Sequence, residues 1–192
     1  LHDALPICFA SQVAQVREPQ TMRVMHVDLD YVYDKDPAQQ KRNIDKLIQR
    51  VYDMRISHVF LQAYADPKGD GNIREVYFPN RWLPMRADLF NYISWQLQTR
   101  AGVTVYAWMP VLAFDLDASI PRVTAWDPKT GRTAINHENY VRLSPWSSEA
   151  RQRITEIYED LAKHASFKGI LFHDDAFLTD FEDRSEEHTS EL

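Results

Sequence analysis

The stretch VMHVDLDYVYDKDPAQQKRNIDKLIQRVYDMRISHVFLQA (residues 24–63) decides the fold. It opens on VMHVDLDY (24–31), whose branched and aromatic residues predict a strand. Asp36 and Pro37 then supply an N-cap and a first-turn proline for a helix. HVFLQA (58–63) predicts a second strand, so the stretch is one strand–helix–strand unit. The helix carries a single apolar stripe, made of Ile44, Leu47, Ile48, Val51 and Tyr52.

The same unit recurs along the chain. Residues 87–100 predict a second amphipathic helix, which Gly102 ends, and 103–109 predict the third strand. A third helix opens near 144–148, and 170–174 predict the fourth strand. Strands that alternate with helices in this order are typical of an α/β fold, with a parallel sheet packed beneath its helices.

The connections are strongly asymmetric. Each helix is linked to the next strand by a few residues, whereas the strand-to-helix links at 64–86 and 110–147 are long. Long loops inside a domain are usually functional, and both (β/α)8 barrels and doubly wound sheets place their sites at the carboxyl ends of the strands. Residues 30–36 contain no glycine, which disfavours a nucleotide-binding Rossmann loop. Four units make about half of a barrel of ~250 residues, so we predict the N-terminal half of a (β/α)8 TIM-type barrel.

Composition narrows the class of protein further. The 192 residues are 44% hydrophobic and 26% charged, which is enough to bury a core and excludes a disordered chain. The formal net charge of -6 argues against a nucleic-acid binder. The single cysteine offers neither a disulfide nor a zinc cluster.

Both ends of the sequence look unlike natural coding sequence. Residues 1–7 (LHDALPI) and 184–192 (RSEEHTSEL) match in-frame translations of common sequencing adapters. We therefore expect both to be processing scars and exclude them from the fold. We expect 8–21 to be a linker from an upstream region and 22–183 to be a partial (β/α)8 domain.

Side chains alternate along each strand, which predicts two different faces. One face carries the aliphatic residues that suit packing beneath helices, such as Val59, Leu61 and Val105. The other is aromatic and becomes acidic toward the carboxyl ends, with Asp174 expected to point into the barrel mouth and Asp175 to start the next loop. That face is expected to carry His26, Asp28, Asp30, Phe60, Gln62, Tyr64, Tyr106, Trp108, Phe172 and Asp174.

Carboxylates beside aromatic rings indicate glycoside cleavage, which uses two carboxylates for proton transfer or nucleophilic attack and ring faces to hold sugars. Asp174 is the candidate catalytic carboxylate. Its neighbour Asp175 diverges from it in a strand, so the second catalytic carboxylate would come from a later strand. Asp28 and Asp30 could instead form a polar layer that binds loop amides. Tyr106 and Trp108 are either sugar platforms or core residues.

Three further interpretations remain open. His26, Asp28 and Asp30, together with the run His173, Asp174 and Asp175, offer ligands for a metal-dependent barrel hydrolase. The run DPKGDGN (66–72) is similar to part of a calcium loop but lacks the distal glutamate, which favours a glycine-rich turn. The same acids and aromatics could also form a non-catalytic glycan-binding module.

The most specific signal lies in the runs FPNRWLPMRADLF (78–90) and GILFHDDAFL (169–178). With them, residues 22–183 resemble the C-terminal domain of the bacterial poly-β-1,6-N-acetylglucosamine deacetylase family. The other runs that carry the resemblance are HVDLDYVYDKDPAQQKRNIDKLIQRV (26–51), VFLQAYADPKGDGN (59–72) and VYAWMPVLAFDL (105–116).

The resemblance implies an N-terminal metal-dependent deacetylase domain followed by a (β/α)8 glycoside hydrolase domain that cleaves partly deacetylated polymer in biofilm export. It implies no cofactor for the hydrolase domain, a divalent metal only in the deacetylase domain, a periplasmic place at the outer membrane and an export porin as candidate partner.

The family's HDDA aspartates correspond to Asp174 and Asp175, which the resemblance implies to be catalytic. The deacetylated polymer is cationic and suits an acidic mouth. We expect substrate contacts from Asp28, Asp30, Tyr64, Asp66, Tyr106 and Trp108.

Overall fold

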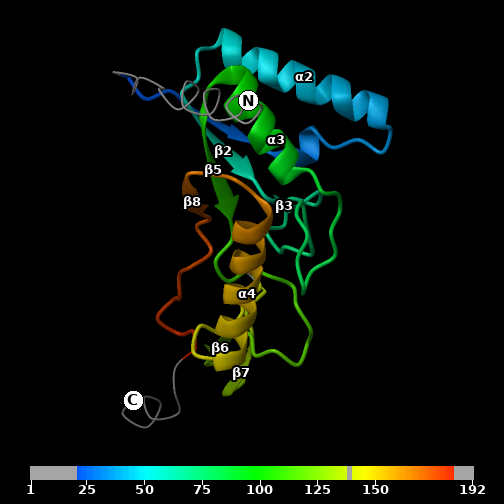
Figure 1. The fold of residues 1–192 in the computed structure, drawn as a ribbon. Coiled ribbons are helices and arrows are strands. Elements are labelled where there is room, and N and C mark those ends of the chain that lie inside the picture. Colours follow the sequence, from blue (N-terminus) through cyan, green and yellow to red (C-terminus); the bar gives the residue numbers. More distant parts are fainter. Residues whose placement is uncertain (1–20, 138–139, 184–192) are drawn as a thin grey trace, which may run out of the picture.

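The computed structural model describes residues 21–137 and 140–183, and it contains one four-stranded parallel sheet (Figure 1). Its strands are β1 (Val24–Val27), β2 (His58–Gln62), β5 (Thr104–Met109) and β8 (Gly169–Phe172). The expected scars at 1–7 and 184–192, and nearly all of the expected linker at 8–21, lie outside the described residues.

The order of the strands is β1-β2-β5-β8, so each strand pairs with the next one in the sequence. A doubly wound sheet would reverse its order at a switch point, whereas a (β/α)8 barrel adds every strand on the same side. The sheet therefore has the order of the first four strands of a barrel, which confirms the predicted fold class.

Three helices cover one face of this sheet. They are α2 (Pro37–Asp53), α3 (Phe90–Gln96), which a π-helical turn (Leu97–Ala101) continues, and α4 (Ser148–His164). The Asp36 carboxylate caps α2 by accepting a hydrogen bond from the Ala38 N–H, and Ser147 caps α4 in the same way. The core between helices and sheet includes Ile48, Val51, Val59, Leu61, Phe90, Ile93, Val105, Ala107, Ile157 and Leu161. In the described residues, no helix is both long and apolar enough to cross a membrane.

Several predicted boundaries differ from the structure, and β8 ends at Phe172, two residues before the end of the predicted strand at 170–174. β1 ends at Val27 because the Asp28 carboxylate accepts a hydrogen bond from the Asp30 N–H and caps a 3-10 turn (Leu29–Tyr31). α3 begins at Phe90, three residues later than expected, and no side chain caps it. Gly102, with a φ of 66°, ends the helical run as predicted.

The long strand-to-helix links contain two small hairpins that the sequence did not reveal. After β2, β3 (Tyr64–Ala65) pairs with β4 (Glu75–Val76), and after β5, β6 (Thr124–Asp127) pairs with β7 (Arg132–Ile135). Both links leave the carboxyl ends of their strands, as predicted.

The predicted face of β8 is wrong by one residue. The register pairs Trp108 with Leu171 and Met109 with Phe172, so Phe172 lies on the helix side, where its ring approaches Tyr158 of α4. His173, rather than Phe172, follows Trp108 on the aromatic face, with the two rings stacked at 5.6 Å. Periodicity predicts that side chains alternate along a strand, but it does not predict which residues of two neighbouring strands pair. The face assigned to each residue of β8 could therefore be wrong by one position.

Candidate active site

A strip of rings runs along the sheet face that no described helix covers. The His26 imidazole meets the Phe60 ring at 5.0 Å and the Trp108 ring at 5.3 Å, both edge to face. Trp108 stacks on His173, whose ring also meets Tyr140 at 5.2 Å. The strip therefore leads from β1 across the sheet to the end of β8, where the candidate catalytic aspartates lie.

Asp174 is an exposed carboxylate that is held on one oxygen. Its Oδ1 lies 2.9 Å from His173 Nδ1 and accepts a hydrogen bond of 3.2 Å from the Tyr140 hydroxyl. The side chain is 84% exposed, and no described residue donates a hydrogen bond to Oδ2. This arrangement fixes the carboxylate while leaving one oxygen open to a bound molecule.

Asp175 has the opposite environment. It is fully buried, and its carboxylate accepts hydrogen bonds from the backbone N–H groups of Val111, Leu112 and Ala113, at 2.7 to 3.1 Å. Its oxygens therefore hold the start of the loop after β5 and do not face the aromatic strip.

The acidic residues after β1 and β2 serve mainly to build the loops. Asp30 accepts hydrogen bonds from the Tyr77 hydroxyl at 2.6 Å and from the Asp66 N–H at 2.7 Å. The Asp66 carboxylate in turn accepts from the N–H groups of Asp70 and Gly71. Asp30 thus matches the polar layer that was the alternative to substrate contact, and Asp66 shapes the 66–72 turn.

Asp28 keeps a partly exposed carboxylate beside these two. Burial raises its pKa, the hydrogen bond from the Asp30 N–H opposes that rise, and the charges of Asp30 and Asp66 add to it. The Asp28 carboxylate therefore gains a proton more readily than an ordinary aspartate.

The predicted aromatic contacts lie at different depths. Trp108 is half-buried in the strip, next to His173, and so lies close to Asp174. The Tyr64 ring is buried and meets Trp108 edge-on at 5.8 Å, and burial raises the pKa of its hydroxyl. Tyr106 lies in the middle of β5, where it pairs with Gly169 and its ring meets those of His58 and Phe60.

Two residues of the site, Tyr140 and His173, were missed by the sequence analysis. His173 was considered only as a candidate metal ligand. Because the predicted face of β8 was wrong by one residue, His173 was not expected on the aromatic face. Tyr140 lies in a long irregular link with no periodicity to place it. Burial raises the pKa of its hydroxyl, and the charge of Asp174 and their hydrogen bond raise it further.

A buried ion pair ties the link that carries Tyr140 to the segment after Asp175. The guanidinium of Arg142 binds the Glu182 carboxylate and the Phe177 carbonyl oxygen, and both charged side chains are fully buried. Burial alone would raise the pKa of Glu182, but hydrogen bonds from Thr179 N–H, Asn136 and Arg142 lower it overall. The pair closes the two strand-end loops against each other.

No group of three or more His, Cys, Asp or Glu side chains is arranged to hold a metal ion within residues 21–137 and 140–183. The aspartates of the two candidate ligand motifs make separate contacts. Asp28 accepts a hydrogen bond from the Asp30 N–H, and Asp30 accepts one from the Tyr77 hydroxyl. Asp174 accepts from the Tyr140 hydroxyl, whereas Asp175 accepts from the Ala113 N–H.

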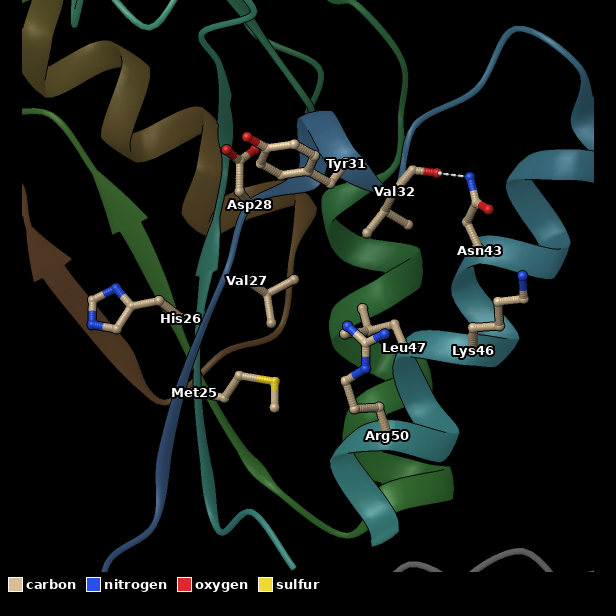
Figure 2. Close-up of a pocket in the computed structure, with 10 residues that line it drawn as sticks. All are labelled: Met25, His26, Val27, Asp28, Tyr31, Val32, Asn43, Lys46, Leu47 and Arg50. Atoms are coloured by element: carbon tan, nitrogen blue, oxygen red, sulfur yellow. Dashed lines mark hydrogen bonds between the residues drawn. The ribbon is translucent and has the colours of Figure 1, made fainter. Parts of the chain in front are cut away.

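A cavity of about 340 Å³ lies elsewhere, between the edge strand β1 and α2 (Figure 2). Met25 and Val27 face α2 there, opposite Lys46, Leu47 and Arg50, while His26 points away toward the aromatic strip. The cavity is therefore on the helix side of the sheet and is separate from Asp174.

Comparison with known proteins agrees with this architecture. The chain is 56% identical over 177 residues to poly-beta-1,6-N-acetyl-D-glucosamine N-deacetylase of Escherichia coli K12, and equally to that of strain O157:H7. The match covers 92% of this chain but only 26% of either relative, so the chain spans about a quarter of their length.

A solved structure matches as well. The PgaB (BpsB) glycoside hydrolase domain from Bordetella bronchiseptica shares 55% identity with a TM-score of 0.78, over 88% of this chain and 49% of that one. The model of the family described as "Hypothetical glycosyl hydrolase family 13" matches residues 26–191. Since that match covers most of the sequence, the chain belongs to this glycosyl hydrolase family.

Proposed function

We propose that this chain forms the first half of a glycoside hydrolase barrel that binds and cleaves partly deacetylated poly-β-1,6-N-acetylglucosamine. The single observation that carries the proposal is the Asp174 carboxylate, which is 84% exposed at the end of β8 and anchored through Oδ1 alone. A carboxylate fixed in direction but open on its second oxygen can hold or attack a sugar at the carboxyl edge of the sheet.

Asp174 is proposed as a catalytic carboxylate and Asp175 as its supporting neighbour. Glycosidases act through two carboxyl groups on either side of the scissile bond. Asp175 cannot supply the second group from its position, because its oxygens accept hydrogen bonds from three backbone N–H groups. The partner would come from another strand end of the barrel.

The surroundings suit a cationic sugar polymer. Trp108 and Tyr140 flank the same histidine as Asp174, and rings of this kind pack against the faces of sugars. Asp28 adds a partly exposed negative charge on the same side of the sheet. Free amino groups of a deacetylated polymer would be attracted to such an edge.

The names of the relatives support the choice of polymer, and their length supports a longer protein. We propose that residues 22–183 belong to a gene product that also carries a metal-dependent deacetylase domain. We also propose a periplasmic place at the outer membrane, with an export porin as partner.

The test uses that full-length protein, incubated with partly deacetylated polymer and followed by mass spectrometry of the products. Wild type should release shorter oligomers, and Asp174→Asn should reduce cleavage by at least about a hundredfold while the polymer still binds. Cleavage that survives in Asp174→Asn would remove Asp174 from the mechanism.

The control is Asp88→Asn, an exposed aspartate just before α3. If wild type binds the polymer and never cleaves it, the chain is a glycan-binding module instead. Measuring binding and cleavage on the same samples separates these outcomes.

A further inference from the structure

The 66–72 segment, which the missing distal glutamate predicts to be a glycine-rich turn rather than a calcium loop, lies directly against Tyr140. Gly71 has a φ of +70°, and a Cβ built on it would lie 2.2 Å from Tyr140 Cε1. No side chain fits in that space while the ring stays in place. The turn therefore forms one wall of the position that Tyr140 occupies.

A second contact fixes the backbone next to that ring. The Asn72 Oδ1 accepts a hydrogen bond of 2.9 Å from the Val141 N–H. A hydrogen bond inside the turn holds its shape: the Asp66 carboxylate accepts a hydrogen bond of 2.9 Å from the Gly71 N–H. Asp30 anchors the start of the turn through the Asp66 N–H.

These contacts connect the loop after β2 to the carboxylate after β8. Asp66 holds Gly71, Gly71 abuts the Tyr140 ring, and the Tyr140 hydroxyl donates to Asp174 Oδ1. We propose that the 66–72 turn is a positioning element: it seats Tyr140 and thereby sets the direction of the Asp174 carboxylate. This inference rests on the proposed function of Asp174, and it assigns to Gly71 and Asn72 a role without substrate contact.

The turn provides its own matched control. Gly69 also has a positive φ, of +63°, but a Cβ built on it meets nothing within 4 Å. Gly69→Ala and Gly71→Ala therefore carry a similar backbone penalty, and only Gly71→Ala displaces Tyr140.

Two measurements on the full-length protein test the proposal. In kinetics on partly deacetylated polymer, Gly71→Ala should lower kcat by roughly 10- to 100-fold with a smaller change in KM, while Gly69→Ala should stay near wild type. In NMR spectra of histidine-labelled protein, the His173 ring signals should shift in Gly71→Ala alone, because the Tyr140 ring lies 5.2 Å from that imidazole.

A double variant tests whether Gly71→Ala acts through the Tyr140 ring. In a Tyr140→Ala background no ring remains to be displaced, so Gly71→Ala should cause no further loss of kcat or shift of His173. If Gly71→Ala does not fold, Asn72→Ala, which removes the acceptor of the Val141 N–H, should show the same pattern more weakly.

Unmoved His173 signals in both Gly71→Ala and Asn72→Ala, or equal effects of Gly69→Ala and Gly71→Ala, would overturn the positioning role. Shifted His173 signals in a protein that never cleaves the polymer would leave the turn's role standing and refute the proposed activity. The two failures are thus distinguishable.

Discussion

The two faces of the β1-β2-β5-β8 sheet use the same strands for opposite purposes. On the helix side, Leu61 and Val105 are at most 1% exposed in an aliphatic core. On the other side, Phe60, Trp108 and His173 form a strip of half-buried rings. The difference teaches that one alternation along the strands supplies both the stability of the domain and the surface on which a ligand can lie.

The two adjacent aspartates after β8 differ in the same way, since one is buried and the other is exposed. Asp175 turns into the protein and is satisfied by backbone N–H groups, whereas Asp174 stays at the surface beside His173 and Tyr140. The first holds the loop after β5, and the second is the proposed site carboxylate.

The largest expected effect separates these two aspartates. Asp175→Ala leaves three N–H groups without their acceptor, so the free energy of unfolding should fall by about 3–5 kcal/mol. Asp174→Ala should change it by about 0.5 kcal/mol or less, because the side chain is exposed. Urea denaturation of both variants measures the difference, and equal losses would contradict the contrast.

Neighbouring residues on β2 give the next largest effect. Leu61→Ala opens a cavity in the helix-side core and should cost about 3 kcal/mol of unfolding free energy. Phe60→Ala removes a partly exposed ring and should cost about half as much, while weakening polymer binding in a sedimentation or calorimetric assay. A greater stability loss for Phe60→Ala would mean that the ring strip is a core in its own right.

The smallest effect concerns Asp28 and carries a pH dependence. Burial raises its pKa in the folded state, so wild type loses stability as the pH rises from the unfolded-state value through the folded value. Asp28→Asn can still cap the 3-10 turn and avoids this cost.

We therefore expect Asp28→Asn to be slightly more stable at pH 7, by about 0.5 kcal/mol or less, and equal to wild type below the unfolded pKa. Thermal melts across that pH range measure the difference. A variant that is less stable at pH 7 would show that the Asp28 charge is favourable in the fold.

Much of the fold was predictable because its signals are local. The apolar stripe and the Asp36 cap predict α2 nearly to the residue, and Gly102 marks the end of the second helical run. The hairpins in the long links were not predictable, because strands of two to four residues have too little periodicity to recognise.

The place of the candidate site could be predicted from the sequence, but not all of the residues that meet there. The strand order predicts the carboxyl ends of the strands, and the HDDA run proposes Asp174 for the site. Tyr140 and Gly71 do not, since they are far apart in the sequence and meet only when two loops close over the sheet.

The sequence by itself determined the α/β class, the order of strands and helices and the edge at which polar residues gather, because these depend on periodicity, caps and loop lengths along the chain. Only the tertiary structure decided which face His173 joins, which of two adjacent aspartates is buried and how the 66–72 turn meets Tyr140. Those outcomes depend on strand register and on contacts between distant loops, and no local pattern encodes either.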